Sequence, residues 1–257
     1  MDKIINLNAD VAEGWGAYDI GDDAALMKII RSANVACGFH AGDANTMHGL
    51  VMLAKAEGVS IGAHPGFNDL WGFGRRAIRM NPAELEYMVA YQAGALQALA
   101  AYGGLKVTHL KAHGMLYNMA AEDEGYAMAI GRAIKAVDPS VIYVALAGSQ
   151  MVRAAAKLGL AVAREGFCDR RYTEDGRLAP RSVPGSVLRD VDQACEQALR
   201  IVQHGEAVAA NGKTIKVEVD TLCVHGDETK AVAVAGRVKK ALEDGGVQIV
   251  TLPEMIA

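Results

Sequence analysis

Short apolar runs alternate with longer amphipathic segments along most of the chain. That alternation is typical of repeated β-α units, in which the strands form a parallel sheet and helices connect them. The pattern predicts strands near residues Ile4–Asp10, Ala33–Gly38, Val59–His64, Lys106–Lys111, Val141–Ala147, Ala161–Phe167 and Val217–Val224. A further apolar run, Val247–Leu252, indicates a short eighth strand.

Helices are expected between and after these strands, where apolar residues recur at helical spacing. One of them has a clear start signal, because Asn81 is a capping residue and Pro82 suits the first helical position. Its apolar stripe continues to Leu99. The other predicted helices are Asp22–Ser32, Ala44–Glu57, Gly125–Val137, Gln150–Leu158, Asp192–Gln203 and Lys230–Gly245.

This order of elements favours a β/α barrel of the α/β class over an open doubly wound sheet. Polar residues recur at the C-terminal ends of at least five predicted strands, whereas an open sheet usually concentrates its site at one switch point. Asn211–Gly212 lies between short alternating runs and predicts a hairpin turn added to the barrel. No linker or domain boundary is evident, so residues 1–257 are expected to form a single domain.

Composition narrows the class of protein further. The 257 residues are 51% apolar, which supports a sizeable core and argues against disorder. A net charge of −4 without any basic block gives no electrostatic basis for binding nucleic acid or an anionic membrane. The four cysteines are widely spaced, and no run approaches the ~20 apolar residues that span a bilayer. We therefore expect a cytoplasmic protein with reduced thiols.

The first predicted strand has an unusual polar face. Side chains alternate across a strand, so Asn6, Asn8 and Asp10 share one face while the residues between them share the other. The apolar set suits the helix layer, which turns the polar set toward the barrel interior. A purely structural barrel has Val, Ile or Leu there. An inward carboxylate needs a partner or a chemical role, which singles out Asp10.

Five of the seven histidines lie at or just beyond the C-terminal end of a predicted strand. They are His40, His64, His109, His113 and His225. Each of them alone is more often a satisfied surface or core residue than a catalyst. Barrel geometry nevertheless brings all strand ends to one rim, so we expect these groups to converge.

Nearby acidic residues also have plain structural interpretations. Asp43 is more simply the cap of the second helix than a ligand, and Asp227 could cap the last helix. Glu13 could be an ordinary loop carboxylate.

The expected cluster could supply general acids and bases, with Lys111 available for an anionic substrate or a developing charge. It could also bind a divalent metal, because one aspartate and two histidines leave positions open for water. The candidate ligands are Asp10, His40 and His64.

Two long loops add charged groups that could handle substrate. Residues 65–76 are rich in glycine and end at Arg75 and Arg76, and residues 167–181 include Asp169 and Arg170. Long loops at a barrel rim commonly act as lids or specificity elements. Solvation or ion pairing explains individual charges equally well.

Several long motifs, in this order, resemble the LamB/YcsF family. They are NLNADVAEGWG, SANVACGFHAGD, GVSIGAHPGFNDLWGFGRR, YQAGAL, HLKAHGMLYN, FCDRRYTEDGRLAPR, PGSV and DTLCVHGD. The resemblance extends from about residue 4 to residue 245. It implies a distorted seven-stranded β/α barrel similar to the carbohydrate deacetylases, in which a first-strand aspartate and two histidines hold a metal. Asp10 matches that aspartate.

The resemblance also implies a hydrolase that acts on a cyclic amide C–N bond. The expected reaction is the ATP-dependent opening of 5-oxo-L-proline (pyroglutamate) to L-glutamate, carried out with B and C subunits. On this interpretation the lactam is activated by phosphorylation, with ATP as co-substrate. The sequence has no GxxxxGK[ST] phosphate loop, which fits nucleotide activation that relies at least partly on partners. A homo-oligomer is also compatible with the sequence.

The family's characteristic elements fall on specific residues of this chain. Together with the strand-end analysis they predict the catalytic residues Asp10, Glu13, His64, Lys111 and His113. The predicted substrate-binding residues are Asn8, His40, Asp43, Arg75, Tyr117, Asp169, Arg170 and His225. The chain departs from the family's usual residues at Val11–Ala12, Ala112 and Met115, which leaves the polar groups intact.

The working hypothesis is that Asp10 or Glu13 activates a water while His64 or His113 protonates the leaving nitrogen. Lys111 and a loop arginine would hold a carboxylate or phosphate. One alternative is a free-standing, metal-dependent amide hydrolase or deacetylase of carbohydrates, which predicts activity without ATP or partners. The other is a non-catalytic metabolite-binding or regulatory subunit, although so many titratable groups facing one cavity argue against it.

Overall fold

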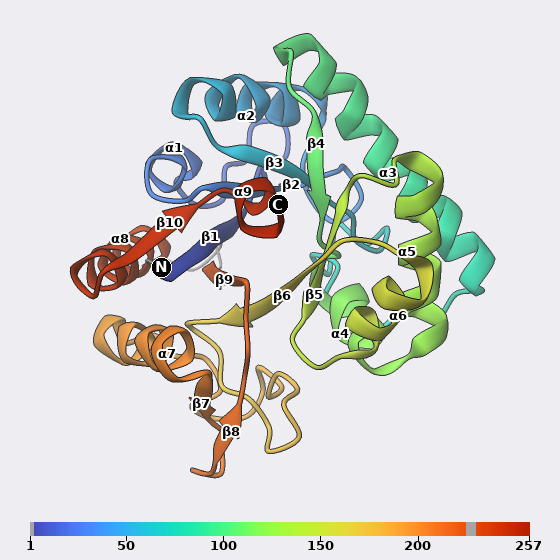
Figure 1. Cartoon of the computed structure of the whole chain (residues 1–257). Coiled ribbons are helices and arrows are strands. Elements are labelled where there is room, and N and C mark those ends of the chain that lie inside the picture. Colours follow the sequence, from blue (N-terminus) through green and yellow to red (C-terminus); the bar gives the residue numbers. More distant parts are fainter. Residues whose placement is uncertain (1–2, 225–229) are drawn as a thin grey trace.

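A closed parallel β-barrel surrounded by helices forms the centre of the protein (Figure 1). The computed structural model describes residues 3–224 and 230–257. The strands are β1 (Lys3–Val11), β2 (Ser32–Ala36), β3 (Ser60–His64), β4 (Val107–Leu110), β5 (Ile142–Leu146), β6 (Val162–Phe167), β7 (Glu206–Val208), β8 (Thr214–Lys216), β9 (Thr221–Val224) and β10 (Val247–Val250). The ring runs from β1 to β6 in order, then through β9 back to β1. Strand β10 pairs with the start of β1 outside the ring, which confirms the seven-stranded barrel and its extra strand.

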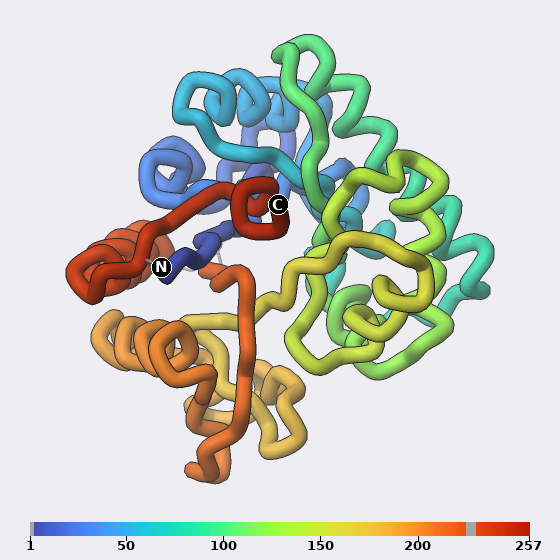
Figure 2. Tube along the Cα trace, viewed as in Figure 1, coloured from blue at the N-terminus to red at the C-terminus, as the bar shows by residue number. Residues whose placement is uncertain are grey.

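The helices follow the strands around the outside, as the chain trace in Figure 2 shows. They are α1 (Asp23–Met27), α2 (Ala44–Glu57), α3 (Pro82–Gly103), α4 (Gly114–Glu122), α5 (Glu124–Val137), α6 (Gln150–Leu158), α7 (Val191–His204), α8 (Ala231–Asp244) and α9 (Leu252–Ile256). The Asn81 side chain accepts a hydrogen bond from the backbone N–H of Ala83, so the predicted cap of α3 is confirmed. No helix within residues 3–224 and 230–257 is long and apolar enough to cross a membrane.

The apolar core lies between the barrel and its helices. Ile5 and Leu7 of β1 are buried in the same cluster as Leu26 of α1 and Val238 of α8. The barrel interior is polar instead. The Asn8 amide donates to Glu165 Oε1 of β6 at 3.1 Å, although β9 separates β1 from β6 in the ring. Such a bond has to cross the interior, which confirms the predicted inward face of β1.

Helix α9 covers the end of the barrel opposite the strand C-termini. It contacts β1, β4 and β6, and in Figure 1 it lies across the middle of the ring. Leu252 packs with Ile142, Val144 and Ala163 in a small separate apolar cluster. The backbone N–H of Leu252 also donates to Ser32 Oγ at 3.0 Å. Helix α9 therefore covers the barrel interior at this end, and the strand C-termini lie at the opposite rim.

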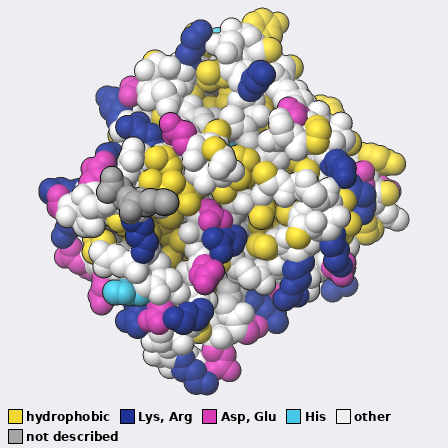
Figure 3. Space-filling model, viewed as in Figure 1, with side chains coloured by type: hydrophobic (Ala, Val, Ile, Leu, Met, Phe, Trp, Pro, Cys, Tyr) yellow, Lys and Arg dark blue, Asp and Glu magenta, His cyan; other side chains and the backbone are white. Residues whose placement is uncertain are grey.

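Some predicted boundaries are wrong. The first helix ends at Met27, because the following residues enter β2, where Ser32 pairs with Asn8. Helices α4 and α9 were not expected, and the strand predicted from Val217 begins only at Thr221. The predicted hairpin is confirmed, since β7 and β8 pair antiparallel on either side of Asn211–Gly212. Figure 3 shows acidic and basic side chains interspersed on one face of the molecule.

Candidate active site

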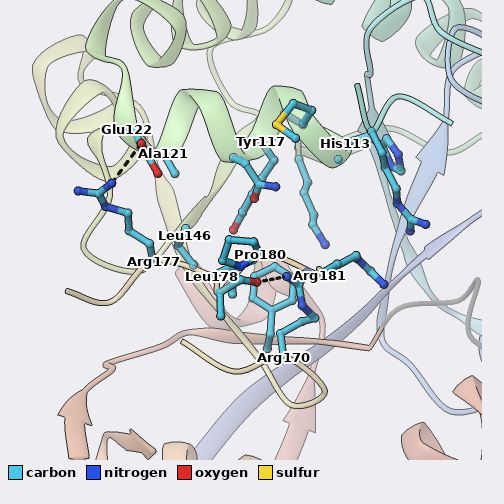
Figure 4. Close-up of a pocket in the computed structure, with 18 of the residues that line it drawn as sticks. His113, Tyr117, Ala121, Glu122, Leu146, Arg170, Arg177, Leu178, Pro180 and Arg181 are labelled. Carbon is cyan, nitrogen blue, oxygen red and sulfur yellow. Dashed lines mark hydrogen bonds and ion pairs between the residues drawn. The ribbon is translucent and has the colours of Figure 1, made fainter. Parts of the chain in front are cut away.

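A cavity of about 520 Å³ opens at the C-terminal ends of the strands. Asp10, His64, Lys111, His113 and Tyr117 line its inner wall. Figure 4 shows Tyr117 and His113 facing the arginines of the loop that follows β6. Its volume is typical of a small-molecule site, and its place in the fold is where β/α barrels carry their chemistry.

Lys111 connects two carboxylates at the floor of this cavity. Its ammonium lies 2.9 Å from Asp10 Oδ1, 3.0 Å from Glu165 Oε1 and 3.0 Å from Cys223 Sγ. Burial lowers the pKa of Lys111, but the charge of Asp10, followed by Cys223 and Glu165, outweighs burial and raises that pKa well above its usual value. Lys111 is therefore a permanent cation that favours the ionised form of Asp10.

Further hydrogen bonds fix the position of these groups. Asn34 donates to Asp10 Oδ1 at 2.8 Å and to Asn8 Oδ1 at 2.7 Å. Tyr117 donates its hydroxyl to Glu165 Oε2 at 2.7 Å. Burial, followed by the charge of Glu165, raises the pKa of Tyr117 well above its usual value. The phenol therefore stays a donor, and the floor of the cavity is rigid.

A second group of buried side chains lies beside Asp10. His64 Nε2 is 3.4 Å from Asp10 Oδ2 and 3.1 Å from His113 Nδ1. Glu13 Oε1 is 3.2 Å from both His113 Nδ1 and His40 Nε2. One atom from each of Glu13, His40, His64 and His113 lies within 4.8 Å of the other three, so this set could hold a metal ion. Burial lowers the pKa of His40 to about 3, with His113 adding to the shift.

Glycines in the surrounding motifs make room for these rings. A Cβ on Gly66 would lie 2.6 Å from His40 Nδ1, and one on Gly74 would lie 2.8 Å from both His40 and His113. A Cβ on Gly62 would overlap the His109 ring. These distances are too short for any side chain. The glycine-rich loop is therefore required by the packing of the histidines.

Phe73 holds the outer side of the histidine group. Its carbonyl accepts a hydrogen bond from His113 Nε2 at 2.8 Å, and its ring meets those of His40 and His113 edge to face. Its φ of 53° is unusual for a residue other than glycine. Strain of this kind commonly persists at functional sites, where the surroundings enforce it.

Arginines supply positive charge at the mouth of the cavity, where Arg75, Arg170 and Arg181 are lining residues. Figure 4 labels Arg170 and Arg181. Arg170 is buried and donates to the Ala179 carbonyl at 2.7 Å. Burial and then the charge of Arg181 lower its pKa to about 10, so it is still a cation at neutral pH. Crowded guanidinium groups of this kind favour an anionic ligand.

Most residues predicted for the site lie at or next to this cavity. Arg75, Tyr117 and Arg170 line it together with the strand-end groups, and Glu13 and His40 lie directly behind His113. Asn8 is deeper in the barrel. Asp169 is buried, and its charge acts on the neighbouring Arg170.

Other predicted residues have a structural role or lie outside the described residues. Asp43 caps α2, and its carboxylate accepts from the backbone of Gly16, Asn45 and Thr46, which matches the simpler interpretation of this residue. His225 and Asp227 lie outside the described residues. The four-residue group that could hold a metal contains Glu13 and His113 where Asp10 was expected. Asp10 Oδ1 binds Lys111 and Asn34.

Sequence reasoning missed two supporting residues, Glu165 and Asn34. Both could have been found by the alternation that singled out Asp10. Glu165 lies on the face of β6 shared by Ala163 and Phe167, two residues to either side. An acidic residue on a buried, otherwise apolar strand face needs a cation, and Lys111 is that cation.

The buried His109 makes stability depend on pH. Burial, then the charges of Lys111 and His64, lowers its pKa from 6.5 to about 3. Below about pH 6.5 His109 is protonated in the unfolded chain but not in the folded protein. The free energy of unfolding therefore falls by up to about 1.4 kcal/mol per pH unit down to about pH 3. We expect the free energy of unfolding, measured in urea, to fall between pH 7 and pH 4.

The variant His109→Gln should weaken that dependence, and His48→Gln, at an exposed position on α2, is the control. If the free energy of unfolding of the His109 variant depended on pH as steeply as that of the wild type, His109 would not be the cause of the dependence.

The closed β/α barrel is a fold that this chain shares with a solved deacetylase. The solved structure of T48 deacetylase with substrate has this fold, with a TM-score of 0.52 at 16% identity over 99% of this chain and 90% of that chain. The chain belongs to the LamB/YcsF family, whose model matches residues 5–257.

Close relatives have descriptive names. The 5-oxoprolinase A subunit of Rhodopseudomonas palustris (strain BisB5) is 54% identical over 247 residues, which cover 96% of this chain and 97% of the relative. The lactam utilization protein from Thermus thermophilus has a solved structure that covers 97% of this chain and 100% of that chain. It matches with a TM-score of 0.92 at 44% identity.

Proposed function

We propose that this chain is the A subunit of an ATP-dependent 5-oxoprolinase. It opens the lactam ring of 5-oxo-L-proline to give L-glutamate, acting with B and C subunits in the cytoplasm. The names of the relatives support the substrate, and the observation that carries the chemistry is the placement of Asp10. Its carboxylate lies at the cavity wall between the Lys111 ammonium and the His64 ring, at 2.9 Å and 3.4 Å.

Hydrolysis of a lactam requires attack of water on the carbonyl carbon, a proton acceptor for that water and a proton donor for the ring nitrogen. Asp10 is the acceptor in this proposal, because Lys111 favours its ionised form. Asp10 lines the cavity wall, so the proton that it accepts from the water can pass to the ring nitrogen. A divalent metal held in the Glu13 and histidine group would polarise the carbonyl and lower the pKa of bound water.

The arginines can bind the negative charge of the substrate. 5-Oxoproline carries a carboxylate, and Arg75 and Arg170 line the mouth of the cavity, where they can bind it. Lys111 is less suited to this task than the sequence suggested. Its ammonium already contacts two carboxylates and Cys223, so it positions Asp10.

ATP belongs to the proposal through the partner subunits. The chain lacks the GxxxxGK[ST] loop that cradles phosphates, so nucleotide chemistry is assigned to the complex. The test is glutamate release from 5-oxoproline by purified B and C subunits, with and without this chain and with and without ATP. Glutamate should form only when all components are present. Equal release without this chain would refute the proposal, and deacetylation by the chain alone would favour the amide-hydrolase alternative.

A further inference from the structure

The group formed by Glu13, His40, His64 and His113 can be resolved into ligands and a supporting residue. All four side chains are buried, and one donor atom of each lies within 4.8 Å of the others. Four such residues do not by themselves make four ligands. Hydrogen positions and ring planes decide which of these atoms can bind a single ion.

Two of the imidazole nitrogens that face each other are unprotonated in the neutral rings. His64 Nδ1 lies 2.7 Å from the Lys111 carbonyl, and His113 Nε2 lies 2.8 Å from the Phe73 carbonyl. A carbonyl oxygen only accepts, so each of these nitrogens carries the ring's one proton. His64 Nε2 and His113 Nδ1, 3.1 Å apart, therefore present lone pairs to each other, and a cation between them removes that repulsion.

The same anchoring is typical of metal ligands. Histidines that bind a metal almost always donate their other ring N–H to a carbonyl or a carboxylate, which fixes the tautomer and the ring orientation. His64 and His113 both do so, through carbonyls on different loops. Their ring planes cross at 87°, so a single point can lie in both planes.

His40 lacks this anchoring hydrogen bond, because its Nδ1 has no partner among the described residues. Its ring is stacked on that of His113, with the planes 6° apart and the centroids separated by 3.6 Å. An imidazole binds a metal along a lone pair that lies in the ring plane, so one ion cannot serve two stacked, parallel rings. His40 Nε2 instead lies 3.2 Å from Glu13 Oε1, where it can donate a hydrogen bond that orients the carboxylate.

Two separations between the proposed donor atoms fit one ion. Glu13 Oε1 is 3.2 Å from His113 Nδ1, and His113 Nδ1 is 3.1 Å from His64 Nε2. Metal–nitrogen and metal–oxygen bonds of about 2.1 Å at angles between about 90° and 109° place neighbouring donors about 3.0–3.4 Å apart. Both of these separations fall within that range, and the donor atoms of Glu13 and His64 lie within 4.8 Å of each other.

We propose that Glu13, His64 and His113 bind one divalent transition-metal ion, and that His40 is a positioning residue for Glu13. Two imidazoles and one carboxylate suit Zn²⁺ or Fe²⁺ and leave positions open for water and substrate. Asp10 Oδ2, 3.4 Å from His64 Nε2, lies where it can accept a proton from a water at the ion. This ligand set replaces the predicted set of Asp10, His40 and His64.

The proposal concerns the site of the proposed function but is tested without turnover. The full chain is treated with a chelator, dialysed and titrated with Zn²⁺ by calorimetry, with metal content measured by mass spectrometry. One equivalent should bind. His64→Ala and His113→Ala should each weaken binding by more than about 100-fold, whereas His40→Gln should weaken it by about 10–100-fold at unchanged stoichiometry.

His109→Gln is the matched control, because His109 is buried in the same barrel but lies outside the group. Circular dichroism identifies any variant that has not folded. X-ray absorption of the wild-type Zn²⁺ complex counts the imidazoles independently of variants, and two are expected.

Failure to bind one equivalent, three imidazoles per zinc, or a His40 variant as weak as the His64 variant would each overturn the assignment. Ring opening by metal-free enzyme would also overturn a catalytic use of the ion while leaving the proposed function standing. Binding of one equivalent of zinc without ring opening of 5-oxoproline would support the metal site and contradict the proposed function.

Discussion

Replacing Asp10 with asparagine is expected to reduce glutamate formation by the assembled enzyme roughly 10²–10⁴-fold, the usual contribution of a general base. Asparagine matches the shape of aspartate and can still contact Lys111 and Asn34, which bind Asp10 Oδ1. It cannot accept a proton from water at neutral pH. The loss should therefore appear mainly in kcat, with the fold intact by circular dichroism.

A matched substitution separates this effect from a general loss of charge. Asp190 caps α7 at an exposed position, and asparagine is an equally good cap, so Asp190→Asn should keep full activity. Activity of the Asp10 variant within a few-fold of wild type would remove Asp10 from the mechanism. The metal proposal would stand, because its ligands do not include Asp10.

Replacing Lys111 with methionine is expected to lower the free energy of unfolding by about 3–5 kcal/mol, the usual effect of breaking a buried ion pair. The substitution leaves the Asp10 and Glu165 carboxylates buried without the cation that contacts both. A buried carboxylate without a counter-ion has lost its hydration and gained nothing in exchange, so the folded state is the one that is destabilised.

Urea unfolding at neutral pH tests this expectation. Adding Glu165→Gln to the Lys111 variant removes one of the two uncompensated charges and should recover part of the loss. Lys157→Met is the control, because Lys157 pairs with Glu124 at the surface and such pairs contribute at most about 1 kcal/mol. If the Lys111 variant were as stable as the Lys157 variant, the buried pair would not hold the barrel interior together.

Strand alternation and barrel geometry predicted much of this arrangement. A period of two places Asn6, Asn8 and Asp10 on one face, and the structure has them inside the barrel. The convergence of His40, His64 and His113 follows from parallel strands that end at one rim. These inferences hold because the regular backbone of a strand fixes the direction of each side chain.

The errors occur where the backbone leaves that regularity. Ala12 has a φ of 58°, so the alternation that holds through Asp10 does not extend to Glu13, whose carboxylate joins the histidines. Helix α4 begins at Gly114, whose φ of 55° and close approach to the Gly74 carbonyl are tertiary features. No local pattern in the sequence reports either turn.

The polar interior of the barrel also limits how the protein can be re-engineered. Hydrogen bonds run in series from the Leu252 backbone through Ser32, Asn6 and Thr221 to Asn8. They continue from Asn8 through Glu165 to the Tyr117 hydroxyl at the cavity. An apolar replacement anywhere along this series leaves the neighbouring donor or acceptor buried without a hydrogen-bond partner. Thermostabilisation by filling the interior with aliphatic side chains therefore has to exchange the whole series together, and doing so would dismantle the floor of the cavity.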